Sequence, residues 1–333
     1  APSKRPSPPP QRQQRHTSAT NAGAPPLKIF QSDWAHEQLP DKHRFPMEKY
    51  RLVREELLQD ASLRGKIAFQ RAPLVARESL ELVHCATYVD RVFSGQLTPK
   101  ENRAIGFPWT AESVTRYRAS AGGTLAALHS VFAGLPVAGH AAGGTHHAFR
   151  DRGEGFCVFN DIGVASVTAM ADYGAAAVPI LVIDLDVHQG NGTADIFQGN
   201  DKVFTFSIHG ANNYPFKTRR RSDLDVDVPD GTTDEEYLSL LEEHLPQLFA
   251  EVKPKLVFYQ AGVDGLKEDS FGRLALTRSG LIRRNNMVYD QCIKNACKLV
   301  ITMGGGYSRP IDATVAACTD VFRTAALKYA ALS

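Results

Sequence analysis

Cysteine is scarce in this chain, with five residues among 333, and no two of them form a Cys-x-x-Cys pair. The five are spread widely along the sequence, at positions 85, 157, 292, 297 and 318. Disulfide frameworks and cysteine zinc sites need closely spaced cysteines, so neither is predicted. We expect the cysteines to be reduced and the protein to be soluble and intracellular.

Long apolar runs and an excess of either charge are also missing. No run of about 18 consecutive apolar residues, the length that crosses a bilayer as a helix, occurs in the sequence, so no membrane span is predicted. The 38 lysines and arginines nearly balance 36 aspartates and glutamates, for a net charge of +2. This balance gives no overall field toward nucleic acid or anionic lipid, and we expect direct binding to neither.

Acidic residues are absent from residues 1–26, which are rich in Pro, Ser, Gln and Arg. A segment of this composition supplies no packed apolar face and is predicted to be disordered. Two interpretations stay open: a tail or linker, or the remnant of an organellar transit peptide, which is typically basic, rich in serine and poor in acids. The compartment is therefore open between the nucleus or cytoplasm and a plastid or mitochondrion.

Apolar runs and amphipathic stretches alternate from residue 27 onward. Residues 47–61 and 234–252 have helical spacing, and Thr233 with Glu236 predicts a capping box at the start of the second stretch. Short β-rich runs lie at 178–186, 202–210, 255–264 and 298–307. Continuous hydrophobic strands separated by helices predict an α/β fold with a mainly parallel sheet and helices on both faces. Because no internal repeat or second linker occurs, residues 27–333 are predicted to form a single domain.

Each of the four β-rich runs ends in residues that are unusual for a core. These are Asp184, Asp186 and His188 in the first run, Ser207 and His209 in the second, Asp264 in the third, and Gly304 to Tyr307 in the fourth. Active sites in open parallel sheets gather at the carboxyl ends of the strands. We therefore expect these residues to meet at one site, although they are far apart in the sequence.

The sequence Asp-Leu-Asp-Val-His at 184–188 predicts a metal site. Side chains alternate along an extended backbone, so Asp184, Asp186 and His188 are expected to point the same way. With Asp264 from another strand end, two carboxylates and an imidazole would hold a divalent ion and leave a position open for water or substrate, as in catalytic sites. For the Asp-x-His motif alone, a hydrogen-bonded surface pair is the alternative.

The adjacent His146 and His147 are suited to acid/base work, because water activated by a metal needs a base and a leaving amine needs an acid. Asp184 and Asn191 are candidate acceptors for the two rings, and Asp184 would keep its imidazole charged more readily. Tyr307, after three glycines, would hold the oxyanion of a tetrahedral intermediate. Histidines satisfied within a loop and a simple glycine turn are the alternatives. Together these groups predict metal-assisted amide hydrolysis.

Six motifs resemble the zinc-dependent histone deacetylase family, which has the arginase/deacetylase fold, and they occur in the family's order. They read GGTHHAFRDRGEGFCVFNDI, VIDLDVHQGNGTADIF, FSIH, YQAGVD, GRLALT and MGGGY. The resemblance extends over residues 28–325. The stretches HRFPMEKYRL and RASAGGTLAA, and YPF followed by a basic run, resemble the class IV branch and its bacterial-type relatives more than class I.

The resemblance implies one Zn²⁺ ion per chain, held by Asp186, His188 and Asp264. It also implies that His146 and His147 form the acid/base pair, with Asp184 and Asn191 behind them, and that Tyr307 polarises the acyl carbonyl. A structural K⁺ ion is implied as well. Its ligands would be the carbonyls of Asp184, Asp186, His188 and Ile208 and the hydroxyl of Ser207.

The resemblance further implies a narrow channel for the acyl-lysine. Its lining would be Gly155, Phe156, Tyr214, Phe271 and Gly305, and Arg44 would line an internal exit cavity for acetate. A core aromatic is the alternative for Phe156, and a surface salt bridge is the alternative for Arg44. Phe271 stands where polyamine-selective relatives carry a glutamate, and Asn191 stands where class I members carry an aspartate.

The leading hypothesis is a zinc-dependent lysine deacylase that acts on acylated lysine of histones or other proteins. A deacetylase of small acetylated amines and a catalytically weak binding module are the alternatives. An arginase-like hydrolase would need two metals and another carboxylate set. The acyl length, the protein substrate, the oligomeric state and the choice between Zn²⁺ and Fe²⁺ stay open.

Overall fold

The computed structural model describes residues 27–35 and 38–332, so the predicted tail at 1–26 lies outside the described residues. Its centre is one eight-stranded sheet in the order β2-β1-β3-β8-β7-β4-β5-β6, and every pairing is parallel. The strands are β1 (Leu27–Gln31), β2 (Ile67–Arg71), β3 (Val137–His140), β4 (Ile180–Asp184), β5 (Val203–Gly210), β6 (Leu224–Val228), β7 (Leu256–Gln260) and β8 (Lys298–Thr302). The predicted α/β fold with a parallel sheet is confirmed.

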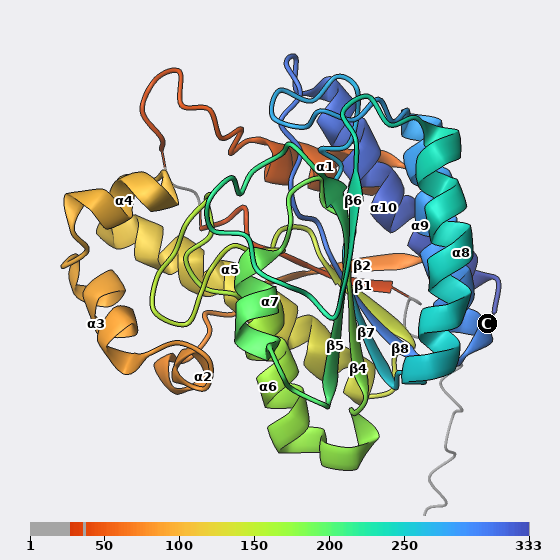
Figure 1. Cartoon of the computed structure of the whole chain (residues 1–333), viewed down its shortest axis with the longest axis horizontal. Coiled ribbons are helices and arrows are strands. Elements are labelled where there is room, and N and C mark those ends of the chain that lie inside the picture. The colour runs from red at the N-terminus through yellow and green to blue at the C-terminus, as the bar shows by residue number, and fades with distance from the viewer. Residues whose placement is uncertain (1–26, 36–37, 333) are drawn as a thin grey trace, which may run out of the picture.

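Helices cover the sheet on both faces, as Figure 1 shows for α8 to α10 on one side and α5 to α7 on the other. One layer contains α1 (Lys49–Gln59), α8 (Asp234–Val252), α9 (Arg278–Lys294) and α10 (Asp312–Ala330). The other contains α2 (Arg77–Glu81), α3 (Ala86–Ser94), α4 (Pro99–Ile105), α5 (Ala111–Phe132), α6 (Asp161–Tyr173) and α7 (Asn191–Phe197). Two short 3₁₀ turns, η1 (Ala61–Leu63) and η2 (Gly174–Ala176), complete the described elements.

The apolar strand sequences are explained by this double cover. In β4, Leu181 and Ile183 pack into the core under α8 to α10, whereas Ile180 and Val182 pack into the core under α5 to α7. A strand buried on both faces needs apolar residues at every position rather than at alternate ones. Among the described residues, no helix combines the length and the apolar character needed to cross a membrane.

The two helices predicted from sequence form with small differences at their ends. The Glu236 carboxylate accepts hydrogen bonds from the Thr233 backbone N–H at 2.8 Å and from its hydroxyl at 2.9 Å, so α8 begins at the predicted capping box. The stretch predicted at 47–61 forms α1 over the shorter range Lys49–Gln59.

The sheet order decides where a site can form. The central neighbours β3, β8, β7 and β4 come from two distant parts of the sequence, because β7 and β8 insert between β3 and β4. Because these strands are parallel, their carboxyl ends lie at the same edge of the sheet. The order of the strands reverses between β7 and β4, and ligands bind open parallel sheets at the carboxyl edge near such a reversal. The four segments that follow these strands supply the residues described next.

Candidate active site

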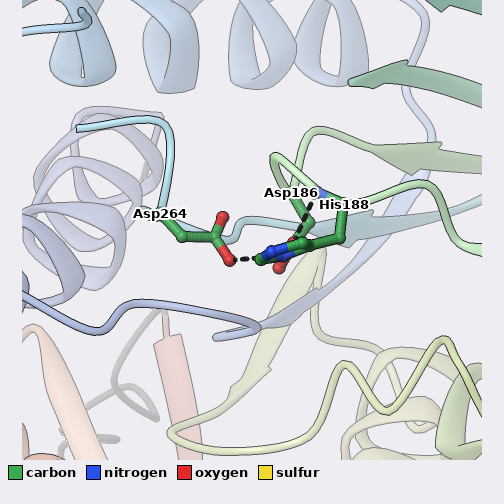
Figure 2. A group of neighbouring side chains, drawn as sticks. All are labelled: Asp186, His188 and Asp264. Atoms are coloured by element: carbon green, nitrogen blue, oxygen red, sulfur yellow. Dashed lines mark hydrogen bonds and ion pairs between the residues drawn. The ribbon is translucent and has the colours of Figure 1, made fainter. Parts of the chain in front are cut away.

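A buried group of two carboxylates and one imidazole lies at the carboxyl edge of the sheet (Figure 2). Asp186 and His188 follow β4, and Asp264 follows β7, the strand beside it. The His188 Nδ1 atom lies 2.9 Å from Asp186 Oδ1 and 3.1 Å from Asp264 Oδ2. One ligand atom from each residue lies within 4.8 Å of the other two, and all three residues are buried. This donor set suits a divalent ion of the zinc type.

The electrostatics of this group also favour a cation. Burial lowers the pKa of His188, but the carboxylates of Asp264 and Asp186 outweigh it and raise that pKa to about 10. Burial raises the pKa of Asp264 to about 7, with the nearby Asp186 adding to the shift. The Asp186 and Asp264 carboxylates are buried and have ligand atoms within 4.8 Å of each other, so a positive charge between them would stabilise both. The residues therefore fit a bound divalent ion.

The expectation of an extended backbone through residue 188 is wrong, because β4 ends at Asp184 and the chain bends after it. Asp184 Oδ1 accepts a hydrogen bond from the Asp186 N–H at 3.2 Å, and Asp186 Oδ1 accepts one from the His188 N–H at 3.0 Å. Carboxylates that bond to the backbone two residues ahead favour turns over strands. The bend directs Asp186 and His188 toward Asp264 while Asp184 faces His146.

His146 and His147 follow β3, and their ring centroids are 4.1 Å apart. The His146 Nδ1 atom donates to Asp184 Oδ2 at 2.7 Å, and the His147 Nδ1 atom donates to Asn191 Oδ1 at the same distance. Both residues are 3% exposed. The structure thus places each histidine on the partner expected for it and leaves the Nε2 atom of each ring for other contacts.

The two neighbouring histidines differ in charge. Burial lowers the pKa of His146, but the Asp184 and Asp186 carboxylates raise it to about 9. Burial also lowers the pKa of His147, and the neighbouring His146 and His188 push it further, well below its ordinary value. A neutral ring beside a charged one gives a base and a cation in the same pocket, which is the division of roles that acid/base catalysis requires.

Glu154, which was not predicted, fixes the orientation of the Asn191 amide. Its Oε1 atom accepts hydrogen bonds from Asn191 Nδ2 at 2.7 Å and from the Thr218 hydroxyl at 2.6 Å. Asn191 Nδ2 also donates to the Thr218 carbonyl at 3.0 Å. With the amide nitrogen engaged, the amide oxygen must face His147, so Glu154 fixes the proton of that imidazole on Nδ1.

Tyr307 follows β8 on the glycine loop, and two charged groups hold this loop. Lys49 is 1% exposed, and its ammonium donates to the carbonyls of Gly304 at 3.2 Å and Gly306 at 3.4 Å. The same ammonium lies 4.9 Å from the centre of the Tyr307 ring. Asp269 accepts a hydrogen bond from the Tyr307 N–H at 2.7 Å. Neither group was predicted: Lys49 lies within the stretch HRFPMEKYRL, but no role was expected for it, and no role was expected for Asp269 either.

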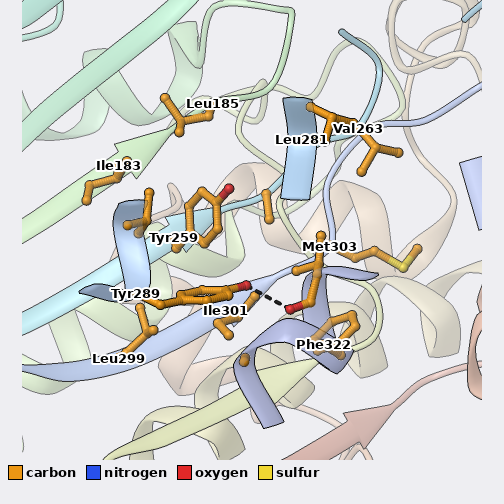
Figure 3. Packing of buried hydrophobic residues seen from close by; sticks show 14 of the residues in the cluster. Ile183, Leu185, Tyr259, Val263, Leu281, Tyr289, Leu299, Ile301, Met303 and Phe322 are labelled. Atoms are coloured by element: carbon orange, nitrogen blue, oxygen red, sulfur yellow. Dashed lines mark hydrogen bonds between the residues drawn. The ribbon is translucent and has the colours of Figure 1, made fainter. Parts of the chain in front are cut away.

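Buried apolar residues pack beside the strand ends that carry the site, and Figure 3 shows part of this cluster. Leu185, Val263 and Met303 each follow a strand end and point into the core, where they join residues of α9 and α10. Arg284 of α9, buried beside this cluster, donates to the carbonyls of Leu185 at 3.0 Å, Gly262 at 2.6 Å and Ala261 at 3.1 Å. One guanidinium therefore joins the backbone segments that carry Asp186 and Asp264.

Close contact with the ligands leaves no room for a side chain at Gly305. Its N–H donates to Asp186 Oδ2 at 2.8 Å, and a Cβ atom at this position would lie 1.9 Å from Asp264 Oδ2. Gly155 is similarly restricted, because its φ of +57° is left-handed and a Cβ would lie 2.7 Å from the His147 ring. Glycine is required at both positions by space, and at Gly155 also by conformation.

A pocket of about 530 Å³ connects the site with the surface. Among the predicted channel residues, Gly155, Phe156, Tyr214 and Phe271 line it, together with His147, His188 and Tyr307. Gly305 lines a smaller space of about 40 Å³ further in, beside His146, His147, Asp186, His188 and Tyr307. Phe156 adopts a left-handed φ of 65°, uncommon for a bulky residue and typical of strained positions at functional sites.

The prediction that Arg44 lines an internal cavity is wrong. Arg44 is exposed and lies at the outer end of the channel, with its guanidinium carbon 5.4 Å from the centre of the Phe271 ring. A cavity of about 410 Å³ does adjoin the inner space, and Arg51 and Arg116 line it instead. Sequence spacing could not distinguish these arginines, because Arg44 lies in a loop before α1, where no periodicity predicts the direction of a side chain.

The residues predicted to bind K⁺ lie together beside the metal group. Ser207 pairs with Asp184 across β4 and β5, and both Ser207 and Ile208 are buried. The Ser207 hydroxyl lies 2.9 Å from His209 Nδ1.

All five cysteines are free, in line with the expectation that they form no disulfide.

The chain matches known proteins over most of its length. The family model for the histone deacetylase domain matches residues 43–324. An uncharacterized protein of Picosynechococcus sp. is 45% identical over 274 residues, which cover 82% of this chain and 89% of that protein. Histone deacetylase 2 of Arabidopsis thaliana is 30% identical over 277 residues, which cover 80% of this chain and 70% of that protein.

A bacterial relative and a solved structure agree with these matches. The histone deacetylase-like amidohydrolase of Pseudomonas aeruginosa is 29% identical over 303 residues, covering 86% of this chain and 78% of that protein. The crystal structure of the HDA15 HD domain has the same fold, with a TM-score of 0.77 at 24% identity, covering 91% of this chain and 90% of that chain. The chain therefore belongs to the histone deacetylase family, whose members are amide hydrolases.

Proposed function

We propose that this chain is a zinc-dependent lysine deacylase, which hydrolyses the acyl amide of acyl-lysine in histones or other proteins. One observation carries the proposal: Asp186, His188, His146, His147 and Tyr307 all line one small space at the inner end of an open channel. A ligand pair, an acid/base pair and an oxyanion donor in one space match the requirements of amide hydrolysis.

Asp186, His188 and Asp264 would hold the metal ion, because their ligand atoms already converge and their buried charges favour a cation. When bound there, Zn²⁺ supplies Lewis-acid polarisation of the acyl carbonyl and makes a water molecule more acidic. The K⁺ ion belongs to the same proposal, with Ser207 and Ile208 on β5 beside Asp184 on β4 as its neighbours.

The proposed chemistry assigns His147 the role of base. Its Nδ1 atom carries a proton and donates it to the hydrogen bond with Asn191 Oδ1, so Nε2 can take a proton from the attacking water. The low pKa of His147 keeps the ring neutral before that step. His146 stays positively charged on Asp184 and stabilises the negative charge that develops beside it. His147 then gives the proton to the departing lysine nitrogen, so that the C–N bond breaks and a free amine and a carboxylic acid form.

Tyr307 is the proposed donor to the oxyanion. Burial raises the pKa of its phenol well above the ordinary value, and the Asp264 and Asp186 carboxylates add to this, so the hydroxyl keeps its proton. The protonated phenol can donate a hydrogen bond to the acyl oxygen as negative charge builds on it. The rings of Phe156 and Phe271 line the channel on the way in and suit the aliphatic stem of a lysine.

The test is turnover by the zinc-loaded chain on acetyl-, octanoyl- and myristoyl-lysine peptides and on acetylated polyamines. Tyr307→Phe should lower kcat by about 10²- to 10³-fold, the usual loss for one oxyanion donor. Tyr173→Phe is the matched control, because Tyr173 ends α6 and its hydroxyl lies 2.7 Å from His129 Nδ1 on α5, outside the pocket that the site residues line. No turnover of any peptide by a zinc-loaded chain would refute the proposal, and turnover of the polyamines alone would favour small amines as substrates.

A further inference from the structure

The outer end of the channel is lined by cations. Three arginines line the pocket of about 530 Å³, namely Arg44, Arg103 and Arg273, and all three are exposed. No aspartate or glutamate is among the described residues that line it. This local excess contrasts with the balanced net charge of +2 for the whole chain. We call these three arginines the arginine rim.

Two members of the arginine rim lie on neighbouring segments, the loop before α1 and the end of α4, which contact each other. Arg44 precedes α1, and Arg103 lies in the last turn of α4. His43 Nε2 lies at hydrogen-bond distance, 2.9 Å, from the Gly106 carbonyl, and the His43 ring stacks on Phe107 with centroids 5.7 Å apart. The Arg44 guanidinium also lies over the Phe271 ring. The backbone near both arginines is therefore held in place by these contacts, and the Arg44 guanidinium is also placed by the Phe271 ring.

The surface around the arginine rim has a net positive charge, because few carboxylates lie close to the three guanidinium groups. Within residues 27–35 and 38–332, neither Arg44 nor Arg103 forms an ion pair. Arg273 has a long contact of 3.4 Å with Asp230, and both side chains are about half exposed to water. Asp269 lies behind the rim, and its Oδ1 atom accepts hydrogen bonds from the Phe271 and Gly272 N–H groups.

A second hollow extends the rim along the surface. It has a volume of about 480 Å³, shares Arg273 and Phe216 with the channel, and adds Arg219. Arg219 pairs with Asp227 at 2.7 Å, but Lys217, next to Phe216, is exposed. Phe216 is 69% exposed, so an apolar ring lies among these cations. The surface offers room for several residues on one side of the inserted lysine.

We propose that the arginine rim selects acyl-lysines that lie in acidic sequence and discriminates against those in basic sequence. This inference rests on the proposed deacylase function. When the acyl-lysine stem fills the channel, the flanking residues of the substrate must lie over Arg44, Arg103 and Arg273. Guanidinium groups bind carboxylates through paired hydrogen bonds, whereas flanking lysines or arginines would be repelled. Within the proposed function, the rim would then favour acyl-lysines of other, more acidic proteins over those in the strongly basic tails of histones.

The test uses three peptides with the same acyl-lysine and with Asp, Ser or Lys at the two positions on each side. For the zinc-loaded chain, kcat/KM should fall in the order Asp, Ser, Lys. Exposed ion pairs each change affinity by about 1.4- to 5-fold, so three arginines should separate the Asp and Lys peptides by about tenfold at low salt. The separation should shrink at 0.5 M NaCl, where the screening length is a few ångströms.

Charge-reversed variants locate the effect. Arg44→Glu combined with Arg103→Glu should reverse the order of the Asp and Lys peptides. Arg64→Glu is the matched control, because Arg64 is exposed just before the amino end of β2, at the opposite edge of the sheet. This control should keep the wild-type order. Equal kcat/KM for the Asp and Lys peptides, or an equal effect of Arg64→Glu, would overturn the inference.

Binding measured by fluorescence anisotropy with the same labelled peptides separates the two proposals. If all three peptides are turned over at equal rates and bind with equal affinities, the rim inference is refuted and the deacylase proposal is supported. Tighter binding of the Asp peptide without turnover of any peptide would support the rim and remove the deacylase. Neither tighter binding nor turnover would remove both.

Discussion

Asn191→Asp tests whether the amide between His147 and Glu154 is required in this chain. Asparagine and aspartate have the same shape, and both offer an oxygen to His147 Nδ1. The difference lies on the other side, where Asn191 Nδ2 donates to Glu154 Oε1 at 2.7 Å and to the Thr218 carbonyl at 3.0 Å. Aspartate has no donor there, so two carboxyl groups would face each other in a buried position.

The loss of unfolding free energy can be calculated from the contact between residue 191 and Glu154. Two unit charges 4 Å apart repel by about 4 kcal/mol at an effective dielectric constant near 20, and these oxygens would be closer. The two carboxyl groups avoid this repulsion when one of them binds a proton. Keeping that proton bound lowers the unfolding free energy by about 1.4 kcal/mol for each pH unit above the ordinary carboxyl pKa of about 4. We therefore expect Asn191→Asp to lose about 3–4 kcal/mol of unfolding free energy at pH 7.

The loss of stability in Asn191→Asp depends on pH. A carboxyl group that must bind a proton in the folded state, but not in the unfolded one, destabilises the fold more as pH rises above its unfolded pKa. The loss should therefore shrink toward about 1–2 kcal/mol at pH 5. Urea unfolding followed by circular dichroism at pH 5, 6 and 7 measures it, with wild-type protein as the reference at each pH.

A second substitution provides the control. In Asn191→Asp with Glu154→Gln, the amide and the carboxylate exchange places, and the new amide can donate to the new carboxylate. The double variant should recover about 2 kcal/mol at pH 7, the scale of a hydrogen bond to a charged group. It should also raise the pKa of His147 and move the acidic limb of kcat/KM to higher pH. An Asn191→Asp protein as stable as wild type at pH 7 would refute this reasoning.

Three further predictions concern the metal and the glycine loop. Asp264→Asn keeps the oxygen that accepts from the Val187 N–H but removes a ligand charge, so zinc content by mass spectrometry should fall while the far-ultraviolet circular dichroism is unchanged. Gly305→Ala should weaken zinc affinity by about 10- to 100-fold in a competition assay with a chelator, because its Cβ would displace Asp264; unchanged affinity would contradict the contact. Lys49→Met should lower kcat by about tenfold at full zinc content, since the loop carrying Tyr307 loses its ammonium, and an unaltered kcat would exclude this role.

The fold and the location of the site were accessible from sequence for a simple physical reason. Strands buried on both faces, such as β4 and β7, require uninterrupted apolar residues, and polar residues directly after them must lie at the sheet edge. Asp186, His188 and Asp264 could therefore be brought together from sequence alone, even though the backbone between Asp184 and His188 bends rather than extends.

The supporting charges could not be found in this way. Lys49 begins an amphipathic helix and Arg284 lies inside another, where a charged residue ordinarily marks the solvent face. Their burial depends on carbonyls that only the assembled sheet presents. Glu154 lies in a loop, so no periodicity predicts its direction. Arg44 was misplaced for the same reason, because a loop residue has no face until its neighbours are fixed.

Arg284 contacts the carbonyls of Leu185, Gly262 and Ala261, and these carbonyls belong to both segments that carry the donor residues. This guanidinium and the apolar residues around it contact both segments that carry the donor residues, so the protein itself contributes to their placement. Small zinc modules behave in the opposite way, since they unfold when the metal leaves. With the proposed Zn²⁺ bound at this site, we expect the chain to lose and regain the ion as a folded protein, so that metal supply would switch the proposed activity on and off without new synthesis.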